Sequence, residues 1–201
     1  MNKFLTIVLP VYLANIALSV VGFAWVISLR GMGSETPHVE LAVIWTFLLV
    51  VQMVLAEKKH PAHKWVGRVA LIILFVSMYD GIFALVELVD DEQNRRSAVN
   101  MVSIGLTGVA AVIYAAIGVW CAIRKNYEAH AVAMLIAGAM TMTAGQARAS
   151  SALFRLFEIP GSLSYSLAVL SIAAALWVWR PSQRYLIASY ALLMMCMIFF
   201  E

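Results

Sequence analysis

Seven long apolar segments occupy most of this 201-residue chain and limit its fold more than any other feature. Crossing the hydrocarbon core of a bilayer takes about 20 residues of α-helix, and each segment is close to that length. The connections between them are short and contain Gly, Pro or charged residues, which favour turns. The segments are Phe4–Leu29, Val39–Ala56, Trp65–Val89, Ala98–Ile123, Glu128–Leu153, Ser162–Trp179 and Tyr185–Phe200. The sequence therefore predicts an all-α polytopic transmembrane bundle of seven helices, or of six if the short last segment does not cross.

The composition favours lipid as the solvent and excludes a water-soluble domain. Hydrophobic residues make up 63% of the chain and charged residues 12%, whereas a soluble domain carries about 25% charged residues. No connection is long enough to form a separate domain, so residues 1–201 are expected to form one integral-membrane domain. The formal charge of +3 does not indicate nucleic-acid binding, because the basic residues lie mainly in loops. The expected partners are the bilayer, other membrane subunits or a second copy of the chain.

The distribution of Lys and Arg predicts the orientation in the membrane, because cytoplasmic loops carry an excess of these residues. With a cytoplasmic N-terminus, nine of them lie on the cytoplasmic side, namely Lys3, Lys58, Lys59, Lys64, Arg68, Arg124, Lys125, Arg180 and Arg184. Five lie on the other side, namely Arg30, Arg95, Arg96, Arg148 and Arg155. This difference predicts a cytoplasmic N-terminus and an exterior C-terminus.

Small residues recur at helical spacing on the fourth and fifth predicted helices. The fourth carries Gly108, Ala111, Ala115, Gly118 and Ala122, and the fifth carries Ala129, Ala133, Ala137, Thr141, Gly145 and Ala149. Small side chains let helix backbones approach closely, which stabilises helix association in lipid. The pattern predicts that both helices are central in the bundle. The alternative is that small residues are simply common in membrane helices.

Two histidines are the first candidates for chemistry. His63 stands at the mouth of the third predicted helix and His130 lies one turn into the fifth, so both are expected at similar depth on the cytoplasmic side. Two neutral imidazoles on neighbouring helices suit the iron of a haem, such as haem b. Together with His60 and Glu128 they would suit a non-haem metal, the weaker possibility. The alternative is that these histidines lie at the interface and bond water, lipid headgroups or carbonyl groups.

Asp80 is the charged residue that most needs a partner. It lies some fifteen residues into the third segment, and an unpaired carboxylate at that depth is unfavourable. Arg148, five helical turns beyond His130, belongs to the same half of the membrane, so the sequence predicts an intramembrane pair between Asp80 and Arg148. Asn15, near the middle of the first segment, is expected to extend this polar network. The alternative for Arg148 is that its guanidinium reaches the exterior interface.

Two motifs resemble a known family. Residues 63–68, His-Lys-Trp-Val-Gly-Arg, fit a pattern of a histidine followed by a Gly-Arg pair at the start of a helix, and His130, Met134 and Arg148 fit a second pattern. Together they resemble an uncharacterised family of bacterial predicted membrane proteins, domain of unknown function 2306, over about residues 57–153. That family in turn resembles haem-binding membrane bundles of the b561 type. The resemblance implies a protein of the bacterial inner membrane.

Three functions are compatible with these patterns. The first is a small redox or cofactor-associated membrane protein with His63 and His130 as ligands. The second is a non-catalytic accessory or scaffold subunit that packs against partner membrane proteins. The third is a small-solute or proton pathway lined by Asp80, Arg148 and Asn15. The sequence contains no nucleophile elbow, zinc-protease motif, Walker loop or dinucleotide fingerprint in a supporting context, so it does not predict an enzyme that acts on its own.

Overall fold

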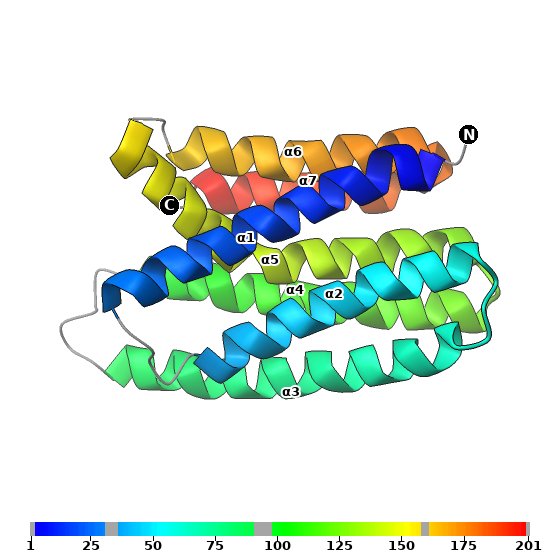
Figure 1. Ribbon diagram of the computed structural model, residues 1–201, viewed down its shortest axis with the longest axis horizontal. Coiled ribbons are helices and arrows are strands. Elements are labelled where there is room, and N and C mark those ends of the chain that lie inside the picture. The colour runs from blue at the N-terminus through cyan, green and yellow to red at the C-terminus, as the bar shows by residue number, and fades with distance from the viewer. Residues whose placement is uncertain (1–2, 31–35, 91–97, 158–160, 200–201) are drawn as a thin grey trace.

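The computed structural model describes residues 3–30, 36–90, 98–157 and 161–199, and this part of the chain is helical except for short turns (Figure 1). The elements are η1 (Phe4–Val8), α1 (Leu9–Arg30), α2 (Thr36–Glu57), α3 (His63–Asp90), α4 (Ala98–Ile123), α5 (Tyr127–Phe157), α6 (Gly161–Trp179), η3 (Pro181–Gln183) and α7 (Arg184–Phe199). The seven α-helices coincide with the seven apolar segments to within a few residues. The all-α fold predicted from the sequence is confirmed.

The helices lie lengthwise beside one another, with α5 between the pair α6 and α7 on one side and α3 on the other (Figure 1). α5 packs against α1, α2, α4, α6 and α7, which makes it the central helix, as its small residues predict. The same prediction for α4 is wrong. α4 packs chiefly on α5 and more weakly on α3, and side chains on its outer face, such as Leu106, Val109 and Ile113, are exposed.

α1 and α5 approach so closely that only glycine fits at their crossing. A Cβ atom on Gly145 would collide with the hydroxyl of Ser19, and a Cβ on Gly22 would lie 2.6 Å from the backbone nitrogen of Ala149. The Ser19 hydroxyl uses this proximity to donate a hydrogen bond of 3.1 Å to the carbonyl of Met142. Dispersion contacts and interhelical hydrogen bonds of this kind hold helices together in lipid.

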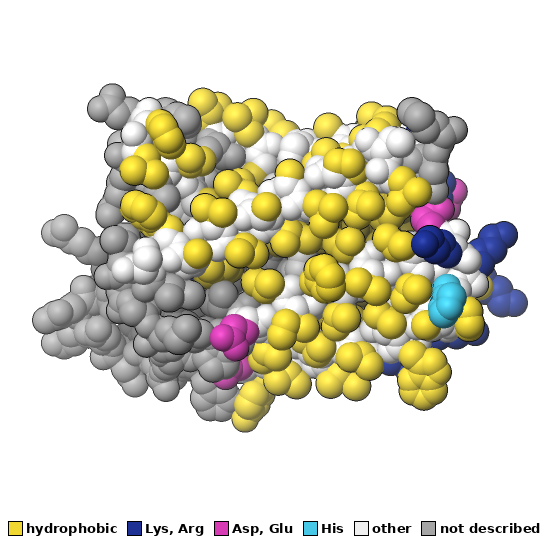
Figure 2. Space-filling model, viewed as in Figure 1, with side chains coloured by type: hydrophobic (Ala, Val, Ile, Leu, Met, Phe, Trp, Pro, Cys, Tyr) yellow, Lys and Arg dark blue, Asp and Glu magenta, His cyan; other side chains and the backbone are white. Residues whose placement is uncertain are grey.

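Within the described residues, four helices are long and apolar enough to cross a membrane, over Phe4–Trp25, Glu40–Glu57, His63–Ile82 and Gly105–Ile123. The model thus supports four of the seven predicted spans. α5 is outside this set, and it is the helix that packs against the largest number of other helices among the described residues. Hydrophobic side chains cover much of the visible surface along the length of the helices, which is compatible with contact to a bilayer (Figure 2).

Among the residues that the structure describes, the basic side chains other than Arg148 gather at one end of the bundle (Figure 2). The turns α2–α3, α4–α5 and α6–α7 meet there, and a salt bridge of 3.3 Å from Arg180 to Glu128 joins two of them. These turns carry most of the residues predicted for the cytoplasmic side. Of the five predicted for the opposite side, the structure describes the side chain of Arg148, whereas those of Arg30, Arg95, Arg96 and Arg155 lie outside the described residues. Which end faces the cytoplasm remains a prediction.

Gly145→Ala tests the contact between α1 and α5. The added methyl group would meet the Ser19 hydroxyl and lie 2.7 Å from the Ser19 carbonyl oxygen, so we expect a loss of about 1–3 kcal/mol of stability, measured as earlier thermal unfolding in detergent. Gly108→Ala is the matched control, because its methyl group would meet only the flexible Met78 sulfur, at 3.3 Å. Equal losses for the two variants would contradict the close approach.

Candidate functional site

The turns α2–α3 and α4–α5 end their first helices in the same way. Lys59 and Lys125 both adopt the left-handed backbone conformation, with φ of 50° and 59°. In each turn this lysine donates its N–H to the carbonyl three residues earlier, and the next residue donates to the carbonyl five residues earlier. This double hydrogen bond is the Schellman motif, which satisfies the last carbonyls of a helix. α2–α3 and α4–α5 are therefore two hairpins of similar construction.

His63 and His130 occupy similar places in the two hairpins. The Nδ1 atom of His63 lies 3.1 Å from the carbonyl oxygen of Gln52, and that of His130 lies 2.9 Å from the carbonyl oxygen of Gly118. Both carbonyls stand seven residues before the left-handed lysine, since 59 − 52 and 125 − 118 are both 7. A carbonyl only accepts, so each Nδ1 carries a proton and donates. In the neutral imidazole Nε2 is then left with a free lone pair.

A glycine beside a long side chain sets the spacing within each hairpin. One turn after His63, a Cβ on Gly67 would collide with the amide nitrogen of the Gln52 side chain. In the other hairpin the glycine lies on the first helix and the long side chain on the second. A Cβ on Gly118 would lie 2.7 Å from the sulfur of Met134, which follows His130 by one turn. Each glycine lets the two helices of its hairpin lie close enough for the histidine to reach the carbonyl of the preceding helix.

The two imidazole rings meet between the hairpins. Their centroids are 6.3 Å apart and their planes are at 87°. A metal ion about 2 Å from each Nε2 puts two ligating rings roughly 5 to 6.5 Å apart between centres, depending on the angle at the metal. A backbone carbonyl on the other ring nitrogen is the usual means by which proteins orient a ligating histidine. The spacing and the hydrogen bonding of His63 and His130, called the histidine pair below, both fit ligation of one metal ion.

The other two predicted ligands do not join the histidine pair. The Nδ1 atom of His60 accepts the N–H of Ala62 at 3.2 Å and caps the start of α3, as the Asn126 side chain caps α5. Glu128 accepts from Arg180 and from the Ser182 hydroxyl, which hold it at the outer surface. No group of three or more His, Cys, Asp or Glu side chains suited to a metal ion occurs in the described part of the chain. The described part of the chain therefore gives no support to the predicted non-haem site that includes His60 and Glu128.

Two buried polar atoms lie on α2 beyond the histidine pair. The side-chain oxygen of Gln52 and the indole nitrogen of Trp45 are buried and have no hydrogen-bond partner in the structure. The two residues are seven apart and share one face of the helix. Buried polar groups are unfavourable unless they are satisfied, so this face of α2 would be stabilised by a bound molecule with polar atoms. The anchoring role of Gln52 and Gly118 cannot be predicted from the sequence, because every residue has a backbone carbonyl.

Asp80 and Arg148 do not form the predicted pair. One carboxylate oxygen of Asp80 is buried without a hydrogen-bond partner, whereas the Arg148 guanidinium lies 4.8 Å from the ring centroid of Phe23. The reason is the order of the helices, since α3 packs chiefly on α2 while the Arg148 face of α5 packs on α1. Depth in the membrane alone does not bring two residues together.

Asn15 belongs to a separate network. Its side-chain oxygen accepts a hydrogen bond of 2.8 Å from Gln146, and its nitrogen donates to the Val11 carbonyl at 2.8 Å and to the Ser171 hydroxyl at 3.2 Å. Asn15 and Gln146 are both buried. This network joins α1, α5 and α6 away from Asp80, so the structure does not bring Asp80, Arg148 and Asn15 together along one pathway.

A comparison of the chain with protein-family models, curated proteins and solved structures finds no match. The function therefore has to be argued from the geometry of this chain.

A double-mutant cycle tests the separation of Asp80 from Arg148. Residues without contact change stability additively, to within about 0.3–0.5 kcal/mol. We therefore expect the loss in the Asp80→Ala, Arg148→Ala double variant to equal the sum of the two single losses, measured by thermal unfolding in detergent. A double variant that recovers more than about 1 kcal/mol would show that the two residues interact.

Proposed function

We propose that this chain is a haem-binding membrane protein that transfers electrons, in which His63 and His130 would hold the iron. The observation that carries the proposal is the pair of hydrogen bonds from Nδ1 to backbone carbonyls, at 3.1 and 2.9 Å, on two rings whose centroids are 6.3 Å apart. A histidine that only packs or caps has no need for this arrangement on two separate hairpins.

The number of ligands favours haem over a bare metal ion. Protein sites for zinc and similar ions use three or four side chains, and no such group occurs in the described part of the chain. A haem iron takes four nitrogen atoms from the porphyrin and needs at most two from the protein. Haem b binds without covalent attachment, which suits a chain whose two cysteines, Cys121 and Cys196, are far apart in sequence.

Each part of the site has a role in this proposal. The free Nε2 atoms of the histidine pair would hold the iron, and the carbonyls of Gln52 and Gly118 would fix the orientation of the rings. Haem supplies reversible one-electron chemistry when it is bound. Two histidine ligands leave no open position for oxygen or substrate, so electron transfer is the activity that fits. The basic residues at the same end, among them Lys64 and Arg68, suit the two carboxylates of haem.

The arrangement in the membrane is part of the proposal. We propose that all seven α-helices span the bacterial inner membrane, with the N-terminus in the cytoplasm and the C-terminus outside. The support is the excess of basic residues that the sequence predicts on one side, together with the position of the described basic side chains other than Arg148 at one end of the bundle (Figure 2). The motif resemblance to domain of unknown function 2306 and to b561-type bundles points the same way, since α2–α5 form a four-helix unit around the histidine pair.

Absorption spectra of histidine variants test the proposal. The chain would be produced with ample haem, purified in a mild detergent and measured in the oxidised and the reduced state. We expect a Soret band with close to one haem per chain for the wild type and at least a tenfold lower haem content for His63→Ala and for His130→Ala, because each removes a ligand.

His60→Ala is the matched control, since it changes a histidine of the same turn that only caps α3. This variant should keep its haem. A wild-type protein without a Soret band, or an equal loss in His60→Ala, would overturn the proposal.

A further inference from the structure

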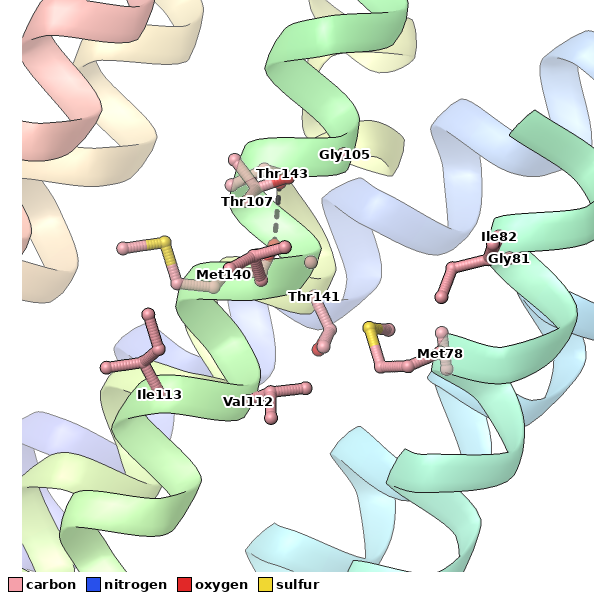
Figure 3. A pocket seen from close by; sticks show the side chains of 13 residues that line it. Met78, Gly81, Ile82, Gly105, Thr107, Val112, Ile113, Met140, Thr141 and Thr143 are labelled. Carbon is pink, nitrogen blue, oxygen red and sulfur yellow. Dashed lines mark hydrogen bonds between the residues drawn. The ribbon is translucent and has the colours of Figure 1, made fainter. Parts of the chain in front are cut away.

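A cavity of about 270 Å³ lies between α3 and α4 and is closed behind by α2 and α5 (Figure 3). The described residues that line it are apolar or glycine, apart from three threonines. Met78 and Ile82 line it from α3, Val112 and Ile113 from α4, and Met140 from α5. An apolar cavity of about 150 Å³ holds a benzene-sized molecule, so this space takes a larger apolar guest.

The cavity exists because three glycines line it. Gly81 on α3 and Gly105 and Gly108 on α4 belong to its wall, and none of them fills space with a side chain. α3 and α4 also touch each other far less than the neighbouring pairs α2–α3 and α4–α5 do. Helices that diverge in this way leave space that side chains do not fill, and in a membrane protein that space must be occupied or it weakens packing.

The mouth of the cavity faces sideways, toward the bilayer. Three of its lining residues, Ile82, Val109 and Ile113, are 61%, 58% and 53% exposed. They belong to the candidate spans of α3 and α4, whose outer faces are in contact with acyl chains when the chain is in a membrane. A guest therefore enters from the hydrocarbon layer and not from water.

The threonine hydroxyls of the cavity wall do not require a hydrogen-bonding ligand. Thr143 donates to the carbonyl of Met140 at 2.6 Å (Figure 3). Thr141 donates to the carbonyl of Gly138 at 2.9 Å. Both hydroxyl protons are thus used within α5. A guest that lacks polar groups leaves none of these hydrogen bonds unmade, which is the condition for burying a plain hydrocarbon chain.

From these features we propose that the cavity binds one hydrocarbon chain of a bilayer phospholipid, inserted sideways between α3 and α4. The site is separate from the histidine pair, because Met140 lies ten residues beyond His130 on α5, about 15 Å by helical rise. The bound chain therefore comes from the leaflet opposite the basic end. It fills the space between α3 and α4 and so stabilises the four helices that also carry the histidine pair.

Substitutions that fill the cavity with a larger side chain test this proposal. Gly105→Leu and Gly81→Leu put a side chain into the cavity from α4 and from α3. Leu106→Phe is the matched control, because Leu106 is 51% exposed on α4 and does not line the cavity. The purified chain and its variants would be delipidated in detergent and given palmitoyl-oleoyl phosphatidylethanolamine, and native mass spectrometry and thermal unfolding would then be measured.

We expect one tightly held lipid on the wild type and on Leu106→Phe, with a lipid-dependent rise in unfolding temperature. Both glycine variants should hold at least tenfold less lipid and lose most of that rise, while remaining at least as stable as the delipidated wild type, which shows that they fold. Lipid retention by the filled variants equal to that of the wild type, or no retained lipid on the wild type, would overturn the proposal.

Discussion

The hydrogen bond from a histidine Nδ1 to a carbonyl of the preceding helix is the interaction on which the candidate site depends. It requires the two helices of a hairpin to lie close together just beyond the turn, which the glycines Gly67 and Gly118 permit. The bond also sets the chemistry, because it decides which ring nitrogen carries the proton and which offers a lone pair. Two successive hairpins make the same bond to equivalent carbonyls, which indicates that the bond serves the same function in both.

Central packing by α5 places the two hairpins relative to each other. α5 contacts α1 through glycine and serine, and hydrogen bonds among the side chains of Asn15, Gln146 and Ser171 join α1, α5 and α6. In lipid the hydrophobic effect does not drive helices together, so these specific contacts contribute much of the stability of helix association. A rigid α5 fixes the position of His130, and the α2–α3 hairpin then brings His63 to it from the other side.

The sequence predicts the helices and the depth of the histidine pair well, but it does not predict which helices are neighbours. His63 and His130 could be placed together because each follows a turn at the same end of the bundle. The pairing of Asp80 with Arg148 rested on depth in the same way and is wrong, because Arg148 faces α1. Asn15 was recognised as a network residue, but its partner Gln146 was not. A helix sequence shows its own faces and not the partner that each face meets.

The most direct measurement of the central claim is the tautomer of the two histidines in the haem-free protein. Nitrogen NMR of ¹⁵N-histidine-labelled protein at about pH 8, where an ordinary imidazole is neutral, separates a protonated ring nitrogen from one with a free lone pair. Signals would be assigned with His63→Gln and His130→Gln. The account predicts that both histidines are protonated at Nδ1 and free at Nε2. A proton on Nε2 of either ring would contradict it.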